Sequence, residues 1–221
     1  DMFNAMVDAM FEYGRFILKE KRKNPANDLL SAIANAEING EKLSNEFLDG
    51  SWLLIIFAGN DTTRNTMSGG IKLLHENQEQ KEMLINDLEL LPNFINETVR
   101  CVSPVIHMRR TSLEETEING QKIGPYEKIA LWYGAANRDP SVFEDPNKFN
   151  ILRDNADKHL AFGIGRHTCI GKPIALMQLQ EFYSQFLVRF QDFEMNGDWK
   201  VAPNNFVHAI QEMPIKYSPE N

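Results

Sequence analysis

The stretch "AFGIGRHTCIGKPIALMQLQ", residues 161–180, places one cysteine, Cys169, among three glycines, and Pro173 then opens an apolar run with helical spacing. Glycine lets a backbone approach a partner closely or adopt a positive φ. Proline suits the first turn of a helix, whose free N–H groups point back toward the sulfur. We therefore expect a loop that holds Cys169 as a thiolate at the start of a helix.

Such a thiolate has three possible uses. Zinc needs about four ligands, and no second cysteine or paired histidine lies nearby in the sequence. A nucleophile needs a base, for which His167 on the same loop is the candidate. Haem needs one thiolate, a flat loop and cationic groups for its propionates, and His167 and Arg166 suit the last task. The loop argues against zinc, and it contains every part that haem needs.

The composition is that of an ordinary globular protein, with 221 residues of which 43% are hydrophobic and 24% charged. The formal net charge of −8 argues against a nucleic-acid partner. The longest apolar run, Trp52–Ala58, is too short for a membrane span. Cys101 and Cys169 are the only cysteines, which fits a reducing compartment and predicts a cytoplasmic protein. The sequence starts inside a periodic pattern, so we expect it to begin within a larger fold.

The hydrophobic pattern predicts a mainly α fold with a minor β component, in a single domain over residues 1–221. The sequence alternates and turns after residue 104, where Asn119-Gly120 predicts a hairpin. Residues 137–159 have no regular period, and residues 206–217 predict a small hairpin or an edge strand. Helices are expected over residues 2–22, 29–36, 44–75, 78–87, 92–102 and 173–190.

Residues 162–171, "FGIGRHTCIG", closely resemble the haem-binding loop of cytochromes P450 in its bacterial form. The resemblance implies haem b as the cofactor, with Cys169 as the axial ligand of its iron and His167 at a propionate. The fold that it implies is the C-terminal half of a P450: the distal helix, the Glu-x-x-Arg helix, a small β-sheet, the cysteine loop and the helix after it. The N-terminal part of that fold has no counterpart in the sequence. Further loop residues that would bind the cofactor are Phe162, Gly163 and Gly171.

Residues 57–65, "FAGNDTTRN", fall inside the longest expected helix, although glycine and threonine are poor mid-helix residues. Taken alone, they indicate a tolerated kink with hydroxyl groups bonded to carbonyls one turn back. They also match the P450 distal-helix motif, in which an acid beside an alcohol delivers protons to oxygen. The resemblance assigns the proton relay to Asp61 and the ordering of oxygen and its water to Thr62, with Thr63 the weaker candidate. Widening of the oxygen groove falls to Ala58 and Gly59.

Glu97 and Arg100 stand three residues apart on an expected helix. Such a pair alone indicates a solvated salt bridge of little weight. In P450s the same spacing forms a buried charge triad beneath the haem, and the resemblance makes Arg153 its third member.

Residues 104–112, "PVIHMRRTS", alone indicate a solvated strand edge. The resemblance puts Arg110 on a haem propionate, with Arg109 as the alternative and His107 undecided. The apolar residues around them would face a lipophilic substrate: Val105, Ile106 and Met108. Phe206 and Val207 are further candidates, for which core packing is an equally good account.

The resemblance implies a monooxygenase that hydroxylates a C–H bond with O₂ and with electrons from NAD(P)H through a ferredoxin. Alkanes, fatty acids, terpenes and sterol side chains are the expected substrates. The region from Lys148 to Arg189 has six basic and three acidic residues, which suits an acidic ferredoxin, although a chance fluctuation explains it as well.

Two alternatives remain at this point. The chain could be a P450-fold isomerase, dehydratase or peroxygenase, against which the pair Asp61 and Thr62 argues. It could also be a fragment without activity of its own. No role is assigned to His75, His159 or His208, although His159 is expected near the proximal face of the haem.

Overall fold

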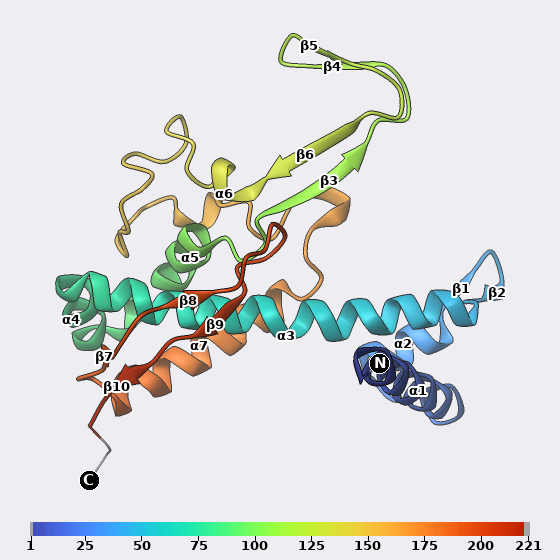
Figure 1. Cartoon of the computed structure of the whole chain (residues 1–221), viewed down its shortest axis with the longest axis horizontal. Helices are drawn as coiled ribbons and strands as arrows, with labels where there is room; N and C mark the ends of the chain where they lie inside the picture. The colour runs from blue at the N-terminus through green and yellow to red at the C-terminus, as the bar shows by residue number, and fades with distance from the viewer. Residues whose placement is uncertain (1, 219–221) are drawn as a thin grey trace. The chain divides into compact units, whose positions relative to one another are not determined.

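The structure is a computed structural model that describes residues 2–218, and the chain divides into two compact units. The first unit extends to Asn60 and the second begins at Asp61. Helix α3 (Asn45–Glu76) crosses this boundary, and it is helical at every residue, including the glycine and threonine positions at which the sequence indicates a kink. Figure 1 labels the elements along the chain.

The first unit contains α1 (Met2–Lys23), α2 (Leu29–Asn35), the short strands β1 (Glu37–Ile38) and β2 (Glu41–Lys42), and the beginning of α3. Its small core is built from one residue each of α1 and α2 and two of α3: Leu18, Ala34, Leu48 and Trp52.

Gly14 of α1 lies against the Trp52 indole, because a Cβ at this position would be 2.4 Å from the ring. The indole Nε1 donates to the Met10 carbonyl at 3.1 Å. Close approach of a small residue and one hydrogen bond therefore join α1 to α3 within the first unit.

The second unit is built on the C-terminal part of α3 together with α4 (Gln78–Asn86), the 3₁₀ turn η1 (Leu88–Leu90), α5 (Leu91–Val102) and α7 (Lys172–Arg189). Aromatic and aliphatic side chains from these helices, together with three from irregular segments, form its core. Its centre is Tyr183, which is fully buried and donates to the Met67 carbonyl at 2.8 Å. The buried members are Ile71, Leu74, Leu84, Leu91, Phe94, Ile95, Val99, Phe149, Ile151, Leu179, Tyr183, Leu187 and Phe193.

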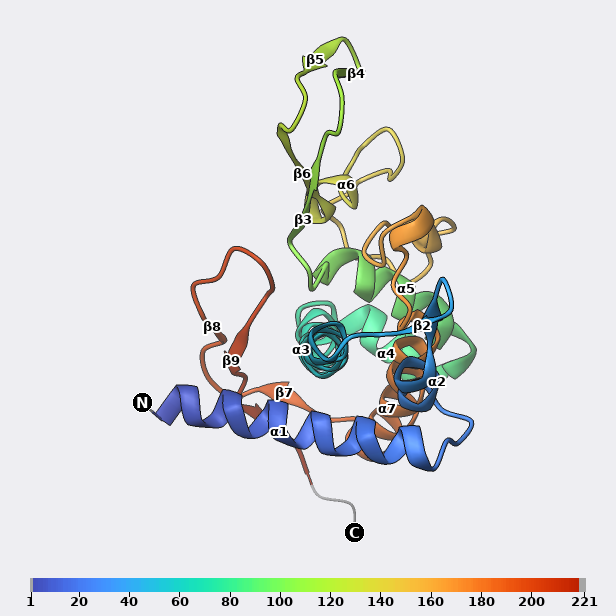
Figure 2. The same cartoon turned by 90° about the vertical axis from the view of Figure 1, so that its right-hand side faces the viewer.

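The strands of the second unit form antiparallel pairs. β3 (His107–Thr111) pairs with β6 (Lys128–Trp132), and β4 (Thr116–Ile118) pairs with β5 (Gln121–Ile123) around the predicted Asn119-Gly120 turn. The β4–β5 hairpin extends from the end of the β3–β6 ribbon in both views (Figures 1 and 2).

The last strands differ from one of the two predictions made for residues 206–217. β9 (Ile210–Glu212) pairs with β8 (Lys200–Val201), and β10 (Ile215–Lys216) pairs with β7 (Glu194–Met195). The prediction of a local hairpin within residues 206–217 is therefore wrong. Pro214 separates β9 from β10, and its carbonyl accepts the Asn196 N–H at 2.9 Å beside the β7–β10 pair.

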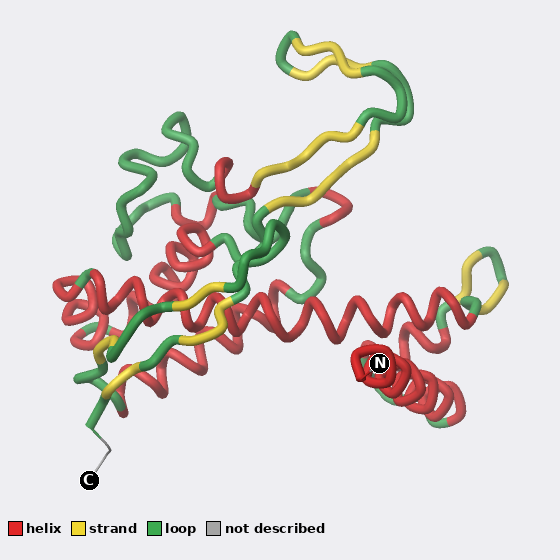
Figure 3. Tube along the Cα trace, viewed as in Figure 1, coloured by secondary structure: helices red, strands yellow, loops and turns green. Residues whose placement is uncertain are grey.

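Residues 137–171 are mostly irregular, as the sequence predicts for 137–159 (Figure 3). The short helix α6 (Tyr133–Ala136) precedes them, and the 3₁₀ turns η2 (Ala156–Lys158) and η3 (Gly165–His167) lie within them. The mainly α fold with a minor β component is confirmed.

Candidate haem-thiolate site

Cys169 lies exposed on the loop between η3 and α7. Its N–H donates to the Phe162 carbonyl at 2.8 Å, which closes the loop on itself. Gly163 has φ +69° and Gly165 has φ +68°, a region that residues with a Cβ rarely adopt. A Cβ at Gly163 would also lie 3.1 Å from the His167 carbonyl oxygen. The glycines are therefore required by the shape of the loop.

The surroundings of the sulfur fit a flat apolar group. Ile164 and Ile170, on either side of Cys169, are 75% and 80% exposed. α7 begins at Lys172, one residue before the predicted start, so its free N–H groups lie three residues beyond the cysteine. One open thiol, apolar neighbours and a glycine cradle are the features that haem coordination requires, and the residues present fit this group.

The second cysteine has the opposite environment. Cys101 is half-buried on α5, where burial and the negative charge of Glu97 raise the pKa of its thiol to about 11. It therefore stays a thiol at neutral pH. A cavity of about 270 Å³ includes Cys101, Arg138 and Trp199 but not Cys169.

Glu97, Arg100 and Arg153 form a buried ion network. Arg100 Nε donates to Glu97 Oε2 at 2.7 Å and its Nη2 donates to Oε1 at 2.8 Å. Arg153 Nε lies 3.2 Å from both carboxylate oxygens. Glu97 and Arg100 are fully buried and Arg153 is 7% exposed. One carboxylate thus serves two guanidinium groups without access to water.

The two arginines also organise the irregular segment. Arg100 Nη1 donates to the carbonyls of Asn137 and Pro146, both at 2.8 Å. Arg153 Nη1 donates to the Glu144 carbonyl at 2.6 Å. The ion network therefore supplies hydrogen-bond donors to a stretch that has no strand partner of its own.

The acid and alcohols of α3 differ in their environments. Asp61 is partly exposed, and its Oδ1 accepts from Arg64 at 2.7 Å. Thr62 is half-buried, whereas Thr63 is buried at 9% exposure. The Thr66 hydroxyl donates to the Thr62 carbonyl, one turn back, at 2.8 Å. Ala58 and Gly59 lie on α3 within the first unit.

The five candidate substrate residues divide between two faces. The bridge between Val105 and Val207 places these two opposite each other, and Val207 is buried at 4% exposure. The next pair along is Ile106 and Phe206, joined by the Ile106 N–H donating to the Phe206 carbonyl at 2.8 Å. Because successive side chains alternate between faces, Ile106 and Phe206 share the face opposite to the two valines.

The arginine pair of β3 is divided in the same way. Met108 and Arg110 share one face of the β3–β6 ribbon and His107 and Arg109 the other. Arg110 is half-buried, with its Nη1 donating to the Arg109 carbonyl at 3.0 Å, and Arg109 is exposed. The His107 ring stacks edge-on against Trp132, at 4.8 Å between centroids.

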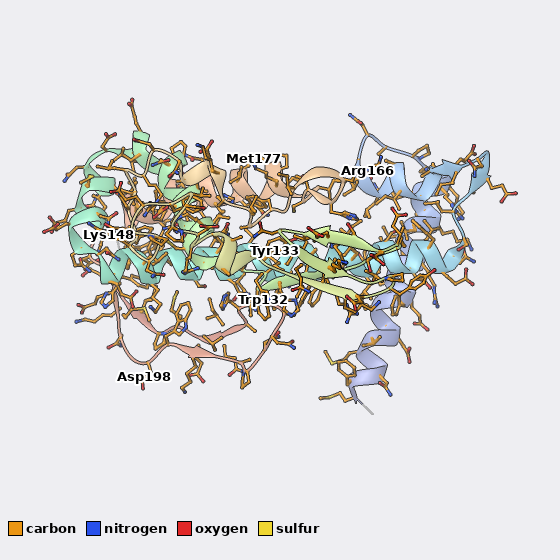
Figure 4. All side chains as sticks on the ribbon, turned by 90° about the horizontal axis from the view of Figure 1, so that it is seen from above. Trp132, Tyr133, Lys148, Arg166, Met177 and Asp198 are labelled. Carbon is orange, nitrogen blue, oxygen red and sulfur yellow. The ribbon has the colours of Figure 1, made fainter. Side chains whose placement is uncertain are left out.

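The hydroxyl of Tyr133, the residue directly after β6, lies near the cysteine loop, because a Cβ at Gly163 would be 3.7 Å from it. Figure 4 labels Trp132 and Tyr133 at this end of the ribbon, and Arg166 on the loop itself. Arg166 and His167 are both exposed.

A family profile for cytochrome P450 matches residues 72–218. This chain belongs to the cytochrome P450 family. Linalool 8-monooxygenase of Pseudomonas putida is 37% identical over 204 residues, which are 92% of this chain and 50% of the relative. Steroid C26-monooxygenase of Mycolicibacterium smegmatis is 37% identical over 213 residues, 96% of this chain and 53% of the relative. By family this is an enzyme sequence, and both of these relatives are monooxygenases by name.

Solved P450 structures show the same fold. Cytochrome P450-153 from Novosphingobium aromaticivorans superposes with a TM-score of 0.87 at 35% identity, over 96% of this chain and 53% of that one. The chain spans about half the length of the curated relatives that it matches. Within residues 2–218, none of the helices has the length and hydropathy of a membrane-spanning segment.

Two residues of this P450 chain were missed by the sequence analysis. Asn137 is fully buried, and its Oδ1 accepts the Leu160 N–H at 2.6 Å just ahead of the cysteine loop. His159 is 7% exposed, and its Nδ1 accepts the Ala161 N–H at 3.3 Å. Their contacts depend on the path of an irregular segment, so no spacing in the sequence could have revealed these two hydrogen bonds.

Proposed function

We propose that this chain is the haem-binding part of a P450 monooxygenase that hydroxylates a lipophilic substrate. The observation that carries the proposal is the exposed Cys169 on a glycine-built loop, with exposed apolar side chains beside it. Cys169 would ligate the haem iron, and His167 and Arg110 would bind the propionates. Bound haem would supply the activation of O₂ and the insertion of one of its oxygen atoms into a C–H bond, while the other atom leaves as water with two electrons and two protons; a thiolate ligand favours cleavage of the O–O bond.

The other residues prepare the site. The Glu97 network holds the backbone of residues 137–153, which leads into the cysteine loop. Asp61 directly precedes Thr62 on α3 and is the proposed proton carrier, and its carboxylate is paired with Arg64. Thr62 is favoured over Thr63 for ordering water, because Thr63 is buried.

For substrate contact, we favour the face that Ile106 and Phe206 share, with Met108 next along the strand. Val105 and Val207 lie on the opposite face, and the burial of Val207 supports a packing role for it. An apolar lining suits a lipophilic substrate. The named relatives act on linalool and on steroids, which supports the same class here.

Electrons would come from NAD(P)H through an acidic ferredoxin. Arg153 is buried in the ion network, and the remaining basic residues between 148 and 189 still outnumber the acidic ones by five to three. Arg166 is exposed on the cysteine loop, where a donor would approach. The Arg166→Glu variant should raise the KM for the ferredoxin, more so at low salt. Such a partner, and the two free cysteines, agree with a cytoplasmic location.

An optical spectrum tests the proposal. Haem added to the chain should give a Soret band, and the reduced CO complex should show the absorption that marks thiolate ligation. Cys169→Ser should abolish that absorption, and Cys101→Ser, the matched control, should retain it. If Cys169→Ser retains it, the assignment of the ligand is wrong. If haem does not bind at all, only the alternative of a fragment without its own activity remains.

The proton path has its own test. Thr62→Ala should uncouple NAD(P)H consumption from product formation, because water is no longer ordered for proton delivery. Thr63→Ala should retain coupling. Full coupling in the Thr62 variant would contradict the role given to this hydroxyl and favour a reaction that does not activate O₂.

A further inference from the structure

The turn at residues 160–163, directly ahead of the cysteine loop, is held by two buried side chains. The Leu160 N–H donates to Asn137 Oδ1 at 2.6 Å, and the Ala161 N–H donates to His159 Nδ1 at 3.3 Å. Both side chains are uncharged acceptors for backbone donors of the turn. Two side chains outside the cysteine loop, those of Asn137 and His159, thus fix the orientation of the peptide groups in this turn.

This turn also forms a hydrogen bond with the backbone of Cys169. The Phe162 carbonyl accepts the Cys169 N–H at 2.8 Å. The Phe162 ring lies 5.6 Å from the His159 ring, between centroids. One imidazole therefore contacts the Ala161 N–H by a hydrogen bond and the Phe162 side chain by ring packing. A shift of this imidazole would move the carbonyl on which the Cys169 amide depends.

The imidazole is an unusual residue at this place. Since its Nδ1 accepts a hydrogen bond, its proton is on Nε2, and this atom is buried without a partner among residues 2–218. A buried donor without a partner destabilises the fold, and an apolar ring would pack here without that cost. Burial, and then the positive charge of Lys172, lower the pKa of His159 to about 4, so the ring is neutral near pH 7 and Nδ1 can accept. What the imidazole adds over an apolar ring is this acceptor.

We propose that His159 is a positioning residue for Cys169, acting through the Ala161 peptide and the Phe162 carbonyl to fix the direction in which the sulfur is presented. The idea rests on the proposed function for the statement that the sulfur binds haem iron. Hydrogen bonds around a ligating sulfur and its loop control how firmly the thiolate is held.

Three variants distinguish the effect of the hydrogen-bond acceptor on His159 from the effect of its ring packing. His159→Phe keeps a ring against Phe162 and removes the acceptor. His159→Asn places an amide oxygen near the position of Nδ1, and His159→Gln places its amide farther out. The matched control is His75→Phe, because His75 Nδ1 accepts the Met195 N–H at 3.2 Å in the same kind of bond, far along the chain from the loop.

The first readout is hydrogen exchange of the Cys169 amide, measured by mass spectrometry before and after haem addition. His159→Phe and His159→Gln should speed this exchange about tenfold, the change expected when about 1.4 kcal/mol of protection is lost. His159→Asn should stay within about threefold of the unmodified protein, and His75→Phe should not change it. This comparison does not need haem, so it is separate from the test of the proposed function.

The second readout is the absorption of the reduced CO complex. His159→Phe should at least double the fraction of this complex in which the sulfur ligand is a protonated thiol. Equal exchange in His159→Phe and the unmodified protein would overturn the proposal. So would failure of His159→Asn to protect the amide better than His159→Gln, since the imidazole would then act by packing alone. If His159→Phe does not fold, the Asn and Gln variants still decide the question.

Discussion

Replacing Glu97 by glutamine removes the one negative charge shared by two buried guanidinium groups. The carboxylate oxygens accept from Arg100 at 2.7 and 2.8 Å and from Arg153 at 3.2 Å, and Oε1 also accepts the Asn150 N–H at 2.9 Å. A glutamine amide keeps one acceptor oxygen. Its NH₂ group would face arginine donors in place of the other, so at least one bond to each arginine becomes a donor–donor contact.

The expected loss in the free energy of unfolding follows from the burial of these side chains. Glu97 and Arg100 are fully buried, so water cannot replace the lost charge. Removing one partner of a buried ion pair costs about 3–5 kcal/mol, a large part of the roughly 5–15 kcal/mol by which proteins are stable. With a urea m-value of about 2–3 kcal/mol/M, the midpoint of unfolding should fall by about 1–2.5 M.

Urea titration followed by far-UV circular dichroism measures this shift. The matched control is Glu20→Gln, because Glu20 pairs with Lys23 at the same i, i+3 spacing at 2.9 Å, but on the surface. The midpoint of this control variant should equal that of the unmodified protein within error. Equal midpoints for the two variants would refute the reasoning, since the buried network would then contribute no more than a solvated pair.

Two further predictions concern other buried groups. The pKa of His159 is about 4 in the folded chain and ordinarily 6.5, so the unfolded chain binds the proton more tightly; stability should be full above pH 6.5 and fall by up to about 3 kcal/mol toward pH 4. Urea titrations across this range should show a flatter pH dependence for His159→Asn, and an unchanged slope would contradict the assignment. A Cβ at Gly70 would lie 2.0 Å from the Tyr183 hydroxyl, so Gly70→Ala should lose about 1–3 kcal/mol. Gly50→Ala on the same helix has nothing within 4 Å and should gain about 0.5–1 kcal/mol; calorimetry that orders the two variants the other way would refute the packing.

Local chemistry explains which parts of the fold were predictable. Asp28 accepts the Ser31 N–H at 2.8 Å and so begins α2 where the sequence predicts it. Pro92 and Pro173 stand in the first turns of α5 and α7. A cap or a proline acts within three or four residues, so its effect is visible in a short stretch of sequence.

The parts that were not predictable depend on distant partners. β9 and β10 pair with strands that precede residue 202, and no local pattern specifies which strand is chosen. The division of Val105 and Ile106 between two faces is fixed by their pairing with residues 206 and 207. The site residues named from the P450 resemblance came from motif positions. Asn137 and His159 belong to no motif used in that comparison, and only the path of the chain brings them to the cysteine loop.

The bonds from Arg100 and Arg153 to residues 137–148 have a consequence for sequence variation. They end on backbone carbonyls, at Asn137, Glu144 and Pro146, and every residue type carries a carbonyl. The order of this segment therefore depends little on the identity of its exposed side chains. Its surface can change its chemistry through substitution while the two arginines keep its course, which makes it a region where related enzymes can diverge without disturbing the core.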